Sequence, residues 1–174
     1  MPTKDRPGRA FAVALGLGLG MAQGAAAWQV DLPAPRLEVV MEGERLAALA
    51  MPQGARICLH WFHSVTGGAV ADCFENRAGR LTLAASFLHD YAAGLGEIPG
   101  RGQPRAVAGG YLIDQIDETL PGNRLSLRVA APHVAQELRG AAGVVPIWRL
   151  APHASRINLV LVDETHRQSV TQDR

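Results

Sequence analysis

Short apolar runs, separated by turn-forming residues, follow one another along most of the chain. The runs that we expect to form strands are Arg36–Met41, Arg45–Ala50, Ala55–His63, Ala69–Arg77, Leu81–Ser86, Val107–Ile116, Leu125–Ala130, Val134–Leu138, Val145–Leu150 and Arg156–Val162. Many short strands at spacings of roughly 8–12 residues are typical of sandwiches and barrels. The pattern therefore predicts an all-β fold with little helix, a single sandwich or barrel-like domain of about eight to ten short strands.

Two stretches depart from the strand pattern. Ser86–Ala93 is the best candidate for a turn or two of helix. Asp90–Arg105 is rich in glycine and proline, which predicts one long loop. Loops of this length are uncommon in compact domains and often carry function when they occur. A plain crossover between sheet edges is the structural alternative.

The hairpin expected from residues 55–77 carries the most information. Alternate residues of a strand share a face, so placing Cys58 opposite Cys73 makes the apolar sets of both strands coincide. The pairs that this register predicts are Ile57 with Phe74, Leu59 with Asp72, and Trp61 with Val70. We therefore predict a cross-strand Cys58–Cys73 disulfide rather than two buried thiols, and chain entropy assigns it about 3 kcal/mol of stability.

The same register leaves Asp72 on the apolar face, where an unpaired acid is costly. His63 lies on that face too, but it is four residues beyond Leu59, or about 13 Å along the strand. The disulfide and a direct His63–Asp72 contact therefore exclude each other unless a bulge intervenes. We expect Asp72 to pair with an arginine or with a backbone amide elsewhere.

Residues 1–27 have the arrangement of a secretory signal peptide. Basic residues precede an apolar run at 10–22, and small residues follow it. Ala25 and Ala27 predict cleavage after Ala27, although an uncleaved membrane anchor is the alternative. The apolar run is shorter than the roughly 20 residues of a membrane span. We therefore expect Sec-type export and a periplasmic or otherwise extracytoplasmic location in a bacterium.

Cleavage would leave a β-rich domain over residues 28–163 and a polar tail, residues 164–174, that we expect to be flexible. The whole chain carries a formal net charge of +1, and Lys4 is its only lysine. Removing the leader would remove three cations and one anion and leave about −1. A nearly neutral domain gives no electrostatic reason to expect a nucleic-acid partner.

The sequence contains no motif that indicates a catalytic or metal centre. His60 and His63 point to opposite faces of a strand, and no ligand spacing suggests a metal. Ser64 follows His63, but neighbours on an extended chain point apart, and no nucleophile elbow is present. The cysteines do not form a C-x-x-C motif, and the Gly94-Leu95-Gly96 stretch lacks the strand-to-helix context of a phosphate loop. We expect no cofactor and no enzymatic activity.

Three features resemble a known family. The turn reads His63-Ser64-Val65, the acid Asp72 follows on the return strand, and the loop Ala93–Gly96 is followed by an acid and a proline. Over roughly Leu37–Val162 the chain is similar to the bacterial family named domain of unknown function 1850. Asp72 stands where that family usually has glutamate, the loop reads AAGLGEIP rather than a Gly-Ala-Gly-Leu-Pro-like sequence, and the cysteines are not part of its pattern.

The resemblance implies a role as well as a site. Members of that family are small exported or membrane-tethered proteins, commonly encoded beside TAXI-type TRAP transporters. The resemblance thus implies a periplasmic accessory protein whose partner is a TRAP solute-binding protein or permease. The binding or interface candidates are His63, Ser64, Val65, Asp72, Gly94, Gly96 and Glu97.

Two alternative functions stay open. One is a free-standing domain that binds a small anionic ligand through Arg101 or Arg105 of the long loop. The other is an enzyme that combines His63 and Asp72 with a third polar group in one pocket.

Overall fold

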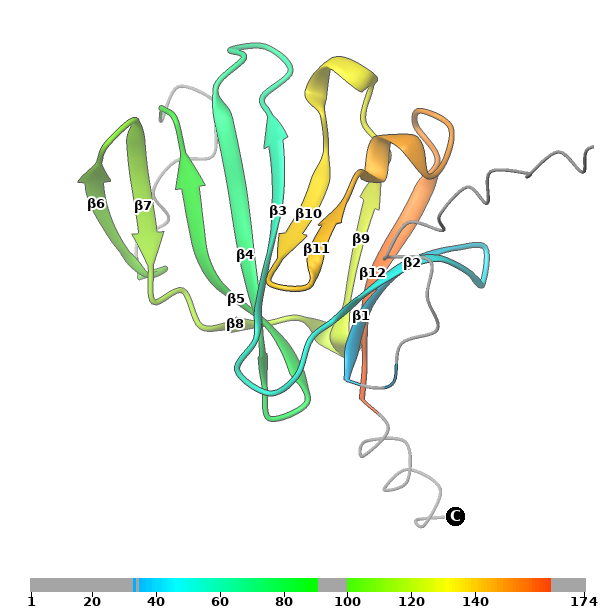
Figure 1. Cartoon of the computed structure of the whole chain (residues 1–174). Coiled ribbons are helices and arrows are strands. Elements are labelled where there is room, and N and C mark those ends of the chain that lie inside the picture. Colours follow the sequence, from blue (N-terminus) through cyan, green and yellow to red (C-terminus); the bar gives the residue numbers. More distant parts are fainter. Residues whose placement is uncertain (1–32, 34, 91–99, 164–174) are drawn as a thin grey trace, which may run out of the picture.

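A computed structural model describes residues 33, 35–90 and 100–163. Within these ranges the chain forms twelve strands in two antiparallel sheets (Figure 1). The strands are β1 (Arg36–Met41), β2 (Glu44–Ala50), β3 (Arg56–Phe62), β4 (Ala69–Arg77), β5 (Arg80–Leu88), β6 (Gln103–Val107), β7 (Gly110–Asp114), β8 (Glu118–Thr119), β9 (Arg124–Arg128), β10 (Glu137–Gly140), β11 (Gly143–Val145) and β12 (Arg156–Val162). The predicted leader 1–27, the tail 164–174 and most of the long loop lie outside the described residues.

The smaller sheet has the strand order β2-β1-β12-β9. The larger sheet has the order β11-β10-β3-β4-β5-β7-β6, and β8 pairs with β5 beside this path. In Figure 1, β6 and β7 lie at one side of the molecule and β1, β2 and β12 at the other. The predicted all-β class is therefore confirmed as two sheets, which do not close into a barrel in the described part of the chain.

The strand count exceeds the predicted eight to ten for two reasons. The first is β6, which begins at Gln103 in the stretch predicted as loop and pairs with β7 inside the run Val107–Ile116 that was predicted as one strand. The second is β8, an additional two-residue strand. The hairpin turns at Ala108 and Gly109, and Gly110 begins β7 opposite Val107. A Cβ at Gly110 would lie only 2.2 Å from the Leu88 carbonyl oxygen, and its φ is 157°. Only glycine fits there.

Helix is confined to three short 3₁₀ turns in the described ranges, at Pro121–Asn123, Pro132–Val134 and Ile147–Arg149. Each begins at or directly after a proline. The second includes Val134, so the strand predicted from there begins only at Glu137, and the third interrupts the run predicted as a strand over Val145–Leu150. The predicted helical turn at Ser86–Ala93 is wrong where it can be seen, because Ser86–Leu88 completes β5. No helix in the described part of the chain has the length and apolar character to cross a membrane.

The core lies between the inner faces of the two sheets. Alternate residues of each strand point inward, as Leu37 and Val39 of β1 show with 0% exposure. The largest fully buried side chains are Leu37, Met51, Ile57, Leu81, Leu88, Leu138, Ile147, Ile157, Leu159, Val39, Val129 and Val145. They come from both sheets, so hydrophobic burial holds the sheets together.

The β3–β4 hairpin has the predicted register. Cys58 lies opposite Cys73 and forms a disulfide with it, and their Cα atoms are 4.0 Å apart. The three predicted apolar-face pairs are all present, namely Ile57 with Phe74, Leu59 with Asp72, and Trp61 with Val70. A shift of one residue would expose this whole set, so the disulfide and the hydrophobic pattern specify the same register.

The disulfide should contribute measurably to stability. We expect the double variant Cys58→Ala/Cys73→Ala to lose about 3 kcal/mol of unfolding free energy, because the unfolded chain regains the entropy of an open loop. Urea unfolding of the oxidised wild type and the variant measures this loss. Reduced wild-type protein is the control and should unfold close to the variant. Equal midpoints for oxidised and reduced wild type would contradict the prediction.

Candidate functional site

The predicted turn residues lie at the tip of the β3–β4 hairpin. The backbone N–H of His63 donates to the Gly68 carbonyl oxygen, and the N–H of Gly67 donates to the His63 carbonyl oxygen, both at 2.8 Å. The N–H groups of Val65 and Thr66 both point at Nδ1 of the His63 ring, at 3.3 Å each. The imidazole therefore acts as an acceptor that braces the turn from within.

This bracing presents an apolar side chain to solvent. Val65 is 87% exposed, and Phe62 at the end of β3 is 49% exposed. Ser64 is exposed beside them. We call Phe62, Ser64 and Val65 the Val65 tip. The braced turn therefore carries two exposed apolar side chains at its tip.

The base of the turn is held by the next strands of the larger sheet. The N–H of His89 donates to the Ala69 carbonyl oxygen at 2.9 Å. Nδ1 of the His89 ring lies 3.0 Å from the Gly109 carbonyl oxygen. A Cβ at Gly68 would lie 2.9 Å from the Cβ of His89, so this glycine lets the turn pack closely. The tip therefore projects from a fixed base.

Asp72 lies on the inner face of β4, as predicted. It alternates with Val70 and Phe74, which are 4% and 2% exposed. Between β4 and β5 the register shifts by one residue, because Phe74 pairs with Leu83 whereas Cys73 pairs with Ala85. This bulge at Ala84 places Ser86 directly opposite Asp72.

The partner of Asp72 differs from the prediction. The Ser86 hydroxyl donates a short hydrogen bond to its carboxylate, in place of the expected arginine or backbone amide. Burial raises the pKa of Asp72 above its usual range, while the Ser86 hydrogen bond and the charge of Arg101 oppose this rise and Glu118 reinforces it. Asp72 is thus a half-buried acid that is costly to ionise.

Arg101 and Glu118 extend this polar group. Nε and Nη2 of Arg101 both lie 2.9 Å from Oε2 of Glu118. Glu118 pairs with Leu83, which pairs with Phe74, so the register puts Glu118 on the same face as Asp72. We call Asp72, Ser86, Arg101 and Glu118 the Asp72 cluster. It holds two acids and one base.

The two arginines proposed for an anionic ligand do not act together. Arg101 is neutralised by Glu118. Arg105 was predicted to end the long loop but lies in β6, so the loop prediction is wrong over Gln103–Arg105. Its neighbour Pro104 pairs with Ile113 on the Asp72 face. Arg105 is therefore on the opposite face. Gly94, Gly96 and Glu97 lie outside the described residues.

The structure also places the histidines that were considered for a metal or catalytic site. His60 points to the outer face, where burial and then Arg139 lower its pKa against the influence of Glu137. His63 is occupied in its own turn, and no contact joins it to Asp72. In the part of the chain that the structure describes, no three histidine, cysteine, aspartate or glutamate side chains gather as a metal site.

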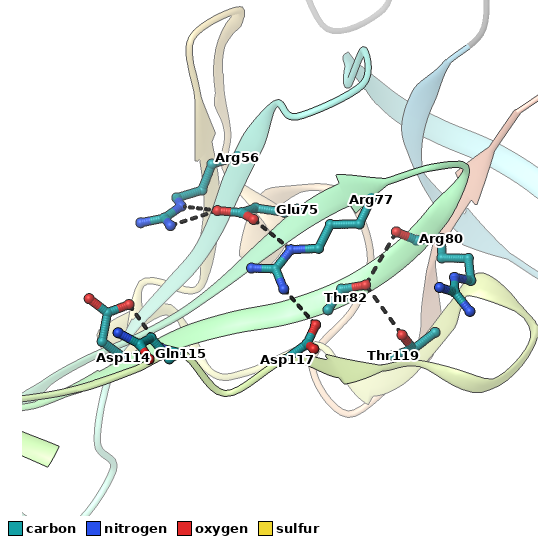
Figure 2. Close-up of polar contacts among 9 residues, drawn as sticks. All are labelled: Arg56, Glu75, Arg77, Arg80, Thr82, Asp114, Gln115, Asp117 and Thr119. Carbon is teal, nitrogen blue, oxygen red and sulfur yellow. Dashed lines mark hydrogen bonds and ion pairs between the residues drawn. The ribbon is translucent and has the colours of Figure 1, made fainter. Parts of the chain in front are cut away.

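The outer face of the larger sheet carries a chain of ion pairs. Figure 2 shows Glu75 of β4 between Arg56 and Arg77, with Arg77 reaching Asp117. Partial burial raises the pKa of Glu75, but the hydrogen bonds and charges of Arg56 and Arg77 outweigh it and hold the pKa below its usual range. The charges balance one another, so this group ties strands together rather than offering a ligand site.

Sequence analysis did not identify two residues of the Asp72 cluster, Ser86 and Glu118. Counting back from the Ala78-Gly79 turn places Ala85, and not Ser86, opposite Asp72. Only the bulge corrects this count, and a bulge leaves no reliable sequence signal. Glu118 was missed because β8 is two residues long.

Neutralising Asp72 should stabilise the fold at neutral pH. Its folded pKa is raised above the ordinary 3.8, so its ionisation costs stability as pH rises through and beyond that value. We expect Asp72→Asn to gain about 1 kcal/mol at pH 7, because asparagine still bonds to Ser86 without a charge. Urea unfolding should show no gain at pH 3. A loss of stability at pH 7 would contradict the account.

Glu75→Gln is the matched variant with the opposite sign. The folded pKa of Glu75 is lowered from the ordinary 4.5, so its contribution is present above that value and lost as pH falls through the folded pKa. We expect a loss of no more than about 1 kcal/mol at pH 7, because solvent screens the exposed arginines. The same urea series measures it. A loss that stayed equally large at low pH would refute the electrostatic origin.

Comparison with known proteins places the chain in a family. No curated protein and no solved structure matches it. The sequence model of the family described as Domain of unknown function (DUF1850) matches residues 57–143, which is half of the chain. The match is narrower than the span of the resemblance, but it includes the Val65 tip, the disulfide and the Asp72 cluster. The chain therefore belongs to the DUF1850 family.

Proposed function

We propose that this domain is a non-enzymatic accessory protein of a TAXI-type TRAP transporter, and that it docks through the Val65 tip onto the solute-binding protein or the permease. The observation that carries the docking surface is the 87% exposure of Val65 on a turn whose own histidine braces it. The transporter class comes from the family resemblance.

The geometry of the tip suits protein recognition. An exposed apolar side chain within a polar surround gains free energy when a partner covers it. Internal hydrogen bonds to the His63 ring fix the loop before binding, which lowers the entropy lost on docking. The interface would be small, as in many transient complexes.

Two features support an extracytoplasmic location for this role. The leader-like sequence of residues 1–27 is typical of exported precursors. The Cys58–Cys73 disulfide is a feature of proteins that mature in oxidising compartments. An accessory protein of a solute-binding system would work in that compartment.

A second candidate function is small-ligand binding at the Asp72 cluster. It is favoured by the half-buried Asp72 carboxylate, which lies on the inner face beside Ser86. Because the cluster holds two acids and one base, it suits a hydroxyl-bearing or cationic ligand better than the anion first considered. Ligand binding that Asp72→Asn abolishes and Val65→Ser leaves intact would favour this function over docking.

Crosslinking and affinity capture from the native envelope test the docking proposal. We expect the wild type to recover a TRAP solute-binding protein or permease, and Val65→Ser to recover about tenfold less, since the valine would lose its buried apolar contact. Val144→Ser is the matched control, because Val144 is 48% exposed on β11, away from the turn.

The results of this capture experiment distinguish docking through the Val65 tip from docking elsewhere. Recovery by Val144→Ser at the wild-type level, with loss in Val65→Ser, supports the tip as the interface. Equal recovery by both variants would place the interface elsewhere. Repeated capture of the domain alone would count against the accessory role.

A further inference from the structure

The open face of the smaller sheet carries an arginine pair at its β9 edge. Arg128 of β9 lies directly opposite Arg156 of β12 in the antiparallel register. Both are exposed, whereas their neighbour Ile157 is 0% exposed in the core. Ser126, two residues before Arg128 on β9, lies opposite Asn158 on the same outward face. Its hydroxyl donates to Oδ1 of Asn158 at 2.6 Å.

These residues surround a hollow. Ser126, Leu127, Arg128 and Arg156 line a surface cavity of about 350 Å³. This volume is within the range of small-ligand pockets. The hollow thus lies beside two exposed arginines and an exposed serine of the outward face.

The charges in this hollow are not balanced. Within residues 35–90 and 100–163, neither Arg128 nor Arg156 forms an ion pair. Glu38 of β1, an acid on the same sheet, contacts Arg36 and Arg45 instead. Like charges directly opposite on neighbouring strands destabilise a sheet. An anion between the two arginines would remove this repulsion.

The arginines of the larger sheet differ from the Arg128–Arg156 pair. Arg56, Arg77 and Arg139 of its strands have a carboxylate partner, and so does Arg101 just before β6. Arg80 forms no ion pair in the described part of the chain, but the charge of Arg77 opposite it is balanced by Glu75 and Asp117. Arg105 lies opposite Leu112, so the described strands of the larger sheet hold no pair of facing arginines that both lack an acid.

One of the two guanidinium groups is already positioned. Nη1 of Arg128 donates to the carbonyl oxygen of Ala154 at 2.9 Å. Ala154 itself has a φ of 67°, an uncommon value for a residue other than glycine. A guanidinium has five N–H donors, so one bond to the backbone orients Arg128 and leaves donors for a ligand.

We propose that this hollow binds a small soluble oxyanion, a phosphate or carboxylate group, between Arg128 and Arg156. The planar guanidinium matches such groups with paired, charge-assisted hydrogen bonds. The site lies on the smaller sheet and the Val65 tip on the larger one, so this proposal does not depend on the docking proposal.

Titrations of the full chain at low ionic strength test the site. The probes are inorganic phosphate and succinate, and the readouts are calorimetric affinity and melting temperature. We expect both anions to bind the wild type and raise its melting temperature, and Arg156→Gln to weaken binding at least about tenfold. Arg105→Gln removes the same charge from an exposed position on β6, where the residue opposite is Leu112, and should bind like the wild type.

A second readout needs no ligand. Without added anion, Arg156→Gln should melt about 1–3 °C above the wild type, because the repulsion with Arg128 is gone. Arg105→Gln should not show this rise, because Leu112 and not an arginine lies opposite Arg105, and added salt should shrink the rise in Arg156→Gln.

Three results would overturn the proposal. The first is an equal response of wild type and Arg156→Gln to both anions, and the second is no response by the wild type. The third is binding to phosphatidylglycerol vesicles without binding of either soluble anion, which would make the arginine pair a membrane contact. None of these results bears on capture through Val65, so the two proposals fail separately.

Discussion

The register of β4 is the constraint on which the rest of the larger sheet depends. On one side the disulfide locks Cys73 opposite Cys58, and on the other the bulge at Ala84 shifts β5 by one residue. Together they decide that Asp72 faces inward with a serine opposite it rather than an alanine. Without the bulge, the buried carboxylate would lack its hydroxyl partner, and an unsatisfied acid in that place would cost the fold heavily.

The two faces of β4 show how environment, rather than residue type, sets the behaviour of a carboxylate. Asp72 and Glu75 are three residues apart, on opposite faces of one strand. Burial dominates at Asp72 and raises its pKa, whereas two arginines dominate at Glu75 and lower it. The inner acid therefore costs stability at neutral pH and the outer one adds to it. A fold that retains a costly acid gives a reason to examine that acid for function.

Sequence reasoning succeeded where the signal was local and failed where it was not. Alternation and the cysteine pair were enough to predict the register from Ile57 to Phe74, because one face had to be apolar. The β6–β7 hairpin was not predicted because β6 begins in a stretch rich in glycine and proline that was predicted as loop. Its turn at Ala108 and Gly109 also lies inside an apolar run that was predicted as one strand. The partner of Asp72 escaped because it depends on a single extra residue in β5. The Arg101–Glu118 pair joins segments whose contact no periodicity encodes. The roles expected for the turn residues stay predictions.

The matched family region does not coincide with the folding unit, and this separates the two proposed surfaces. Residues 57–143 include β9, yet the smaller sheet joins β9 only to β12, which lies beyond that region. Burial of the inner face of β9 therefore requires β12, and β12 in turn pairs with β1. The Val65 tip lies within the matched region, so docking through it is a hypothesis about the family. The arginine hollow needs Arg156 of β12, so oxyanion binding is a hypothesis about this chain. Capture experiments on other family members can therefore test the first without deciding the second.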